Sequence, residues 1–162
     1  MAAVKRWPAG EHDGMETLSI TRSDNRFRHV LLAADLDGSS AHAADEAIDL
    51  AAAQGAVLLI LTVVPPDALP RPLRRGSPNA ERDRRDRAAR DIVARAAARG
   101  VTATSVVWYG APAEAILEAT RTEHADVVVL GSRKRTNLAR MLGSVSSHVA
   151  GEAPCPVVIV PA

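Results

Sequence analysis

Two stretches of the sequence combine glycine, hydroxyl and charged residues in patterns that suit the binding of a phosphate and a sugar. The first, GSRKRTNLARMLGSVSSHVA, runs from Gly131 to Ala150 and directly follows an apolar run. The second, DLDGSS, begins at Asp35. Glycine lets the backbone approach a ligand closely, and hydroxyl and cationic groups donate hydrogen bonds to anions. The two stretches form one site only if the fold brings them together.

The expected phosphate end of this site is Gly131 together with the start of the last helix. Gly143 and Ser144 open that helix, where free N–H groups and the positive end of the helix dipole favour an anion. Candidate side chains near these glycines are the hydroxyls of Ser132, Thr136, Ser144 and Ser146. The spacing alone fits a structural role equally well, in which Ser144 caps the helix and Gly131 turns the chain.

Strand and helix patterns alternate from Arg28 onward. Short apolar runs predict strands at 29–34, 56–64, 101–108, 126–130 and 156–160. Helical patterns lie between them: after residue 40, from about 78 to 99, after 110, and from 144 to 151. This order predicts an α/β fold with a doubly wound five-stranded parallel sheet, strand order 3-2-1-4-5, and helices on both faces.

Ligands of doubly wound sheets bind beyond the carboxyl ends of the strands, where the winding direction reverses. In the predicted order this reversal lies between strands 1 and 4, so Asp35 and Gly131 should face each other across one cleft. A carboxylate repels phosphate. Asp35 is therefore expected at the ribose end, where it would accept hydrogen bonds from hydroxyls, or on a metal ion.

The composition of the chain argues against nucleic acid and membranes as partners. Lys and Arg number 20 against 19 for Asp and Glu, so no field of one sign attracts nucleic acid or an anionic membrane. Aromatic residues make up only 2%, which leaves few platforms on which bases could stack. The longest apolar run, 56–64, is about half of what a membrane helix needs. The single cysteine, Cys155, fits a reducing compartment, and we expect a cytoplasmic protein.

The chain divides into two unequal parts. Residues 1–27 show neither helical nor strand periodicity and are expected to form a flexible extension, and residues 28–162 a single domain. Within the domain, the charged run ERDRRDRAAR from Glu81 to Arg90 is expected to be a solvated helix face with i, i+4 ion pairs, such as Glu81 with Arg85. We find no His, Cys and Glu cluster with the spacing of metal ligands, so no structural metal is expected.

Four segments in register resemble the universal stress protein family. These are DLDGSS with the following AADEAIDLA, the turn YGAPAEAILEA, the run GSRKRTNLARMLGSVS, and the final APCPVVIV, which together span about Arg28 to Pro161. The resemblance implies a five-stranded α/β fold, frequent homodimers through the last strand and, in one branch, binding of ATP by a Gly-x2-Gly-x9-Gly-(Ser/Thr) loop. It also implies a role in the stress response as a switch or sensor.

The resemblance also assigns roles to individual residues. Asp35 matches the family's ribose-binding aspartate, and Val63 matches the second-strand residue beside adenine. Gly131, Gly143 and Ser144 match parts of the phosphate loop, with Ser132 and Ser146 close by. ATP with Mg²⁺ is the implied ligand.

The sequence departs from the family loop in two ways. Lys134 stands where the second glycine is expected, and the stretch to Gly143 is one residue shorter than the family spacing. A side chain at 134 would hinder close approach of a phosphate, whereas direct charge contacts from Arg133, Lys134 and Arg135 would partly compensate.

Other functions fit the same residues less well. No G-x-G-x-x-G follows the first strand, and a receiver-type phosphorelay domain would need an acceptor aspartate where the third strand ends in Trp108-Tyr109. Two alternatives stay open. One is a slow ATP hydrolase that uses Asp37 or His148 as a base. The other is a dimeric interaction protein of the same fold in which Lys134 closes the pocket.

Overall fold

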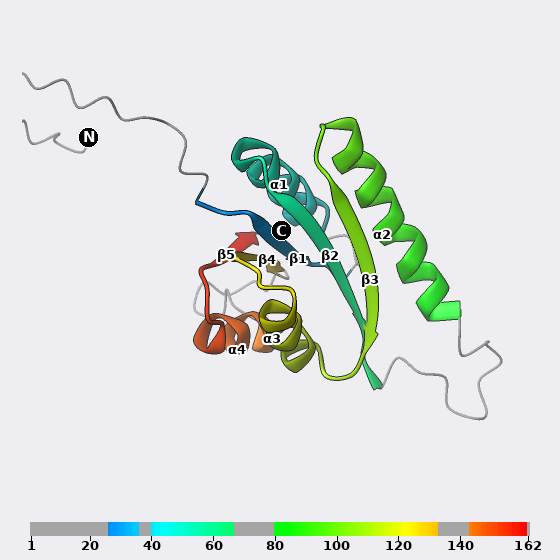
Figure 1. Ribbon diagram of the computed structural model, residues 1–162. Coiled ribbons are helices and arrows are strands. Elements are labelled where there is room, and N and C mark those ends of the chain that lie inside the picture. The colour runs from blue at the N-terminus through cyan, green and yellow to red at the C-terminus, as the bar shows by residue number, and fades with distance from the viewer. Residues whose placement is uncertain (1–25, 36–39, 67–79, 133–142, 162) are drawn as a thin grey trace, which may run out of the picture.

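The computed structural model describes residues 26–35, 40–66, 80–132 and 143–161. Strands and helices alternate along these ranges (Figure 1). Their bounds are β1 His29–Ala33, α1 Ser40–Gln54, β2 Val57–Val64, α2 Ala80–Ala98, β3 Ala103–Tyr109, α3 Pro112–Thr122, β4 Val127–Ser132, α4 Ser144–Glu152 and β5 Val157–Pro161.

The strands form a single parallel sheet in the order β3-β2-β1-β4-β5, which confirms the predicted topology. β1 is central and pairs with β2 on one side and β4 on the other. Ala33 of β1 lies opposite Leu61 of β2 and Leu130 of β4, so these three strands reach the same edge of the sheet together. The winding direction reverses between β1 and β4, as expected.

Helices cover both faces of the sheet, with α1 and α2 on one side and α3 and α4 on the other (Figure 1). The α1–α2 layer packs Ala47, Ile48 and Ile92 onto Leu58 and Ile60. The opposite layer packs residues of α3 and α4 onto the other side of the same strands: Ile116, Leu117 and Val149 against Leu31, Leu61, Val128 and Leu130. Strands covered on both faces carry apolar side chains in both directions, which explains the continuous apolar runs of the sequence.

The third strand begins two residues later than predicted. Residues 99–101 close the end of α2 instead: the N–H of Val101 donates to the carbonyl of Ala96 at 2.9 Å. Gly100 adopts a positive φ of 73°, which glycine accepts without strain. β3 starts after this turn, at Ala103.

The described chain begins at Arg26. The N–H groups of Arg26 and Phe27 donate to Oε1 of Gln54 at 3.0 and 3.4 Å, and the Phe27 ring packs against the core. The predicted extension, residues 1–27, otherwise lies outside the described residues, and the division at 27 stays a prediction. No helix in the described ranges is long and apolar enough to cross a membrane.

Candidate functional site

The candidate site lies at the carboxyl edge of the sheet, where β1 meets β4. Asp35 follows Ala33 by two residues, and Gly131 follows Leu130 directly. Val63 lies two residues beyond Leu61 on the other side of β1. The sheet therefore brings the acid, the glycine and the valine to one edge, although the acid and the glycine are almost a hundred residues apart in the sequence.

Gly131 and Ser132 belong to β4 itself. They lie opposite Val160 and Pro161 of β5, so β4 extends two residues beyond the predicted end at Leu130. Both residues are half-buried. Because Gly131 lies in an ordinary strand, its missing side chain, rather than an unusual backbone angle, is the property available to a ligand.

The start of α4 offers free backbone donors. Gly143 is the N-cap, with φ −67° and ψ 166°, and its carbonyl accepts the N–H of Ser147 at 2.9 Å. The N–H groups of residues 144, 145 and 146, at the start of α4, have no acceptor within the helix. Ser144 is the first helical residue and makes no side-chain cap, so the structural role considered for it is wrong. Ser144 is exposed, whereas Ser146 faces inward and is buried.

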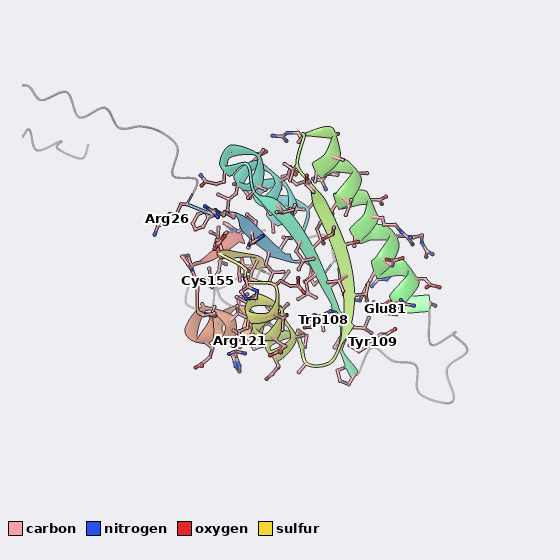
Figure 2. The ribbon with its side chains drawn as sticks, in the orientation of Figure 1. Arg26, Glu81, Trp108, Tyr109, Arg121 and Cys155 are labelled. Carbon is pink, nitrogen blue, oxygen red and sulfur yellow. The ribbon has the colours of Figure 1, made fainter. Side chains whose placement is uncertain are left out.

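Val63 and Trp108 lie opposite each other near the carboxyl ends of β2 and β3. Val63 is 8% exposed and belongs to the core layer beneath α3 and α4. Trp108 lies opposite Val63 in the β2–β3 register, is half-buried and packs against the same layer. Figure 2 shows Trp108 and Tyr109 at the end of β3, at the same end of the molecule as Glu81 of α2. Trp108 had no predicted role in binding.

Arg85 is the second residue that the sequence analysis missed. The predicted Glu81–Arg85 ion pair is confirmed, but the prediction of a solvated helix face is wrong at Arg85, which is only 7% exposed. Its Nε donates to Oε1 of Glu81 at 2.8 Å, and its Nη1 donates to the main-chain oxygen of Asp35 at 3.0 Å. The available signal was spacing: Arg85 shares one helical stripe with the buried residues Ala89, Ile92 and Ala96.

Charges around Glu81 keep its carboxylate ionised. The hydrogen bond from Arg84 lowers the pKa of Glu81 below its usual range, and the positive charge of Arg85 lowers it further. Arg84 is exposed and binds Glu81 through Nε at 3.1 Å and Nη2 at 2.9 Å. Glu81 thus links an exposed arginine to the buried one that contacts Asp35.

Several predicted residues lie outside the described residues: Asp37, Arg133, Lys134, Arg135 and Thr136. His148 is exposed on α4. Within the described ranges, no three His, Cys, Asp or Glu side chains are grouped as ligands for a metal ion. Cys155 is partly buried, and this burial raises the pKa of its thiol, which favours the protonated form at neutral pH.

The chain matches known proteins over almost its whole described length. Residues 26–161 match the Universal stress protein family. A protein of Thermus aquaticus, described as "Universal stress protein in QAH/OAS sulfhydrylase 3'region", is 37% identical over 139 residues, which cover 83% of this chain and 98% of that protein.

Solved structures agree. The universal stress protein UspA from Lactobacillus plantarum superimposes with a TM-score of 0.71 at 26% identity, covering 83% of this chain and 98% of that one. A universal stress protein in complex with cAMP superimposes with a TM-score of 0.65 at 30% identity, covering 83% and 97%. Because the family match spans the whole sheet and both of its helical layers, the chain belongs to the universal stress protein family.

Proposed function

We propose that this protein binds ATP, together with Mg²⁺, at the carboxyl edge between β1 and β4, and that it acts as a nucleotide-dependent switch or sensor in a stress response. The observation that carries the proposal is the pairing of β1 with β4, whose register runs to Ala33 and Leu130, so that Asp35 and Gly131 both follow at the same edge of the sheet. The similar universal stress protein that was solved in complex with cAMP supports an adenine nucleotide as the class of ligand.

The proposed roles follow the chemistry of each group. Asp35 accepts hydrogen bonds from the ribose hydroxyls, and Val63 packs against adenine. The phosphates meet Gly131 at the end of β4 and the free N–H groups that open α4. The side chains assigned to the phosphates are the hydroxyls of Ser132, Ser144 and Ser146 and the cations of Arg133, Lys134 and Arg135.

Mg²⁺ would enter with the nucleotide. Among the described residues, Asp35 is the carboxylate identified at this edge, and its proposed partner is the ribose. Mg²⁺ commonly keeps several waters and binds nucleotide phosphates with few protein ligands. We expect at most slow release of phosphate from ATP.

Thermal unfolding with and without millimolar Mg-ATP tests the proposal. A ligand at a hundred times its dissociation constant stabilises the folded state by about 2.7 kcal/mol. For a chain of this size, that corresponds to a rise in Tm of about 5–10 °C. cAMP, measured in parallel, shows whether the three phosphates of ATP matter. If neither nucleotide shifts Tm, the non-nucleotide interaction protein becomes the better description.

Calorimetry of two variants locates the phosphates. A Cβ added at Gly143 would meet nothing within 4 Å, so Gly143→Ala fits the folded protein, and a several-fold loss of ATP affinity would come from the ligand side. Lys134→Gly restores the family loop residue and should strengthen ATP binding. An unchanged or lower affinity of Lys134→Gly would show that the lysine does not hinder the phosphates.

We also propose a homodimer formed through β5. This strand is an edge of the sheet, and Val158 on it is 41% exposed. An unpaired apolar edge strand is prone to association, and pairing with a second copy across a two-fold axis would satisfy it. Val158→Lys should give a monomer by light scattering. Val57→Lys is the control, because Val57 is 39% exposed but lies on the inner strand β2.

A further inference from the structure

Arg85 is the one charged side chain among the buried residues of the described part of the chain. A buried guanidinium is costly unless its donors find partners. The partners of Arg85 are a carboxylate on its own helix, Glu81, and a main-chain oxygen 50 residues away, at Asp35. The second contact joins α2 to the residue that is proposed to hold the ribose.

The hydrogen bond between Arg85 and Asp35 lies just beyond the last sheet hydrogen bond of β1. The N–H of Ala34 still donates to the carbonyl of Leu61 in β2 at 2.9 Å, one residue beyond the last paired residue of β1. At Asp35 the main-chain oxygen instead accepts a hydrogen bond from Nη1 of Arg85 at 3.0 Å. Partly buried carbonyls need a donor, and here α2 supplies it. The backbone of Asp35 is thus held from the side of the helical layer.

Glu81 fixes the direction of this contact. The guanidinium is planar, so a hydrogen bond from Nε to Glu81 at 2.8 Å sets the direction in which Nη1 projects. Glu81 sits one helical turn before Arg85 and is also bound by Arg84. The carboxylate therefore orients Arg85, and Arg85 in turn orients the main chain at Asp35.

We infer that Arg85 is a positioning residue, which fixes the main chain at Asp35 and thereby gives the site its preference for nucleotides with free ribose hydroxyls. The inference rests on the proposed function. Hydrogen bonds weaken steeply with distance and angle, so a shift of the Asp35 backbone costs the contact to the ribose hydroxyls. It costs contacts to the base and phosphates much less, because other strands and α4 hold those groups.

Arg84 offers a matched control. It precedes Arg85, binds the same Glu81 carboxylate and is exposed, with 54% of its side chain accessible. Arg84→Met and Arg85→Met make the same chemical change and each removes one partner of Glu81. Of these two arginines, Arg85 is the one with a hydrogen bond to Asp35. Arg85→Lys keeps the charge and one donor group and should rescue part of the effect.

The first measurement is amide hydrogen exchange without nucleotide. We expect exchange at Ala34 and Asp35 to rise at least about tenfold in Arg85→Met relative to Arg84→Met, with Arg85→Lys in between, because the end of β1 loses its anchor. Equal exchange in the two Met variants would overturn the role of Arg85 as an anchor.

The second measurement is the ratio of the dissociation constants of 2′,3′-dideoxy-ATP and ATP. We expect this ratio to fall at least about fivefold in Arg85→Met, to stay within twofold of the wild type in Arg84→Met, and to lie between them in Arg85→Lys. If Arg85→Met weakens both nucleotides equally, Arg85 has only a general structural role and the inference is overturned.

The two measurements separate this inference from the proposed function. If the wild type binds neither nucleotide, the proposed function fails and the ribose preference falls with it, while hydrogen exchange still decides whether Arg85 anchors Asp35. If the wild type binds ATP and the ratio does not change in Arg85→Met, the proposed function stands and the positioning role fails.

Discussion

At both ends of β1 the main chain is hydrogen-bonded to a charged side chain that is distant in the sequence, but the two contacts differ in kind. At the amino end, the carboxylate of Asp126 accepts the N–H groups of Arg28 at 2.7 Å and His29 at 2.9 Å. At the carboxyl end, the guanidinium of Arg85 donates to the main-chain oxygen of Asp35 at 3.0 Å. Asp126 comes from the segment that leads into β4, whereas Arg85 comes from a covering helix.

The two contacts hold residues with different roles. The residues beside Asp126 start two neighbouring strands, and none of them belongs to the candidate site. The residues beside Arg85 include the proposed ribose ligand. The same type of contact should therefore affect mainly stability at one end and mainly ligand binding at the other.

Replacement of Asp35 should give the largest change in binding. Asp35→Ala removes the carboxylate but keeps the main-chain oxygen that binds Arg85. Hydrogen bonds to a charged group are worth about 1.5–3 kcal/mol, so ATP affinity should fall about tenfold to a hundredfold by calorimetry. A large loss of Tm with unchanged affinity would make the carboxyl end a structural fixing too.

Replacement of Asp126 should have the opposite profile. Asp126→Ala leaves two backbone N–H groups without their acceptor, and because the carboxylate is partly exposed we expect a loss of about 1–3 kcal/mol of unfolding free energy. Tm should fall by about 2–12 °C in calorimetric scans. ATP affinity should stay within twofold of the wild type. A tenfold loss of affinity would mean that the two ends are coupled through β1.

The amino-end contact should also depend on pH. Hydrogen bonds from the N–H groups of Arg28 and His29 lower the pKa of Asp126 below its ordinary value of 3.8. A carboxyl whose pKa is lowered by folding stabilises the protein fully above its unfolded pKa, and this contribution disappears as the pH falls through the folded pKa. The stability gap between the wild type and Asp126→Ala should therefore be constant between about pH 7 and 5 and shrink below about pH 4. Urea unfolding at several pH values measures this gap, and a gap that widens in acid would contradict the assignment.

A buried hydroxyl on β2, next to β1, is expected to give the smallest effect. Thr62 of β2 is fully buried, and its Oγ1 has no hydrogen-bond partner among the described residues. Thr62→Val removes this hydroxyl at nearly constant shape and should raise the unfolding free energy by about 1 kcal/mol, or Tm by about 2–4 °C. ATP affinity should not change. A loss of stability would indicate a partner for this hydroxyl outside the described residues.

The elements of the fold were largely predictable. The apolar run at 57–64 is buried on both faces except near its start, and the alanine-rich periodicity at 44–51 marks the buried side of α1. These patterns are local, because burial imposes a period on the chain wherever it lies. The start of α4 was predictable for a different reason: a glycine followed by serine is typical of a helix N-terminus.

The ends of the strands and the contacts between distant segments were not predictable in this way. β4 continues through Ser132 because β5 offers backbone partners as far as Pro161. Arg85 was expected in solvent because its neighbours in the sequence are charged, yet its stripe of α2 faces the sheet. Both outcomes depend on a partner far away in the sequence, which local composition does not report.

The sequence by itself determined the alternation of strands and helices, the family resemblance and the residue types of a candidate nucleotide site, since burial patterns and short motifs are local properties. Only the tertiary structure decided that Asp126 and Arg85 hold the two ends of β1 and that Arg85 is buried against Asp35. Those contacts join segments 50 to 98 residues apart, and they arise only when the packed sheet and helices bring the partners within hydrogen-bonding distance.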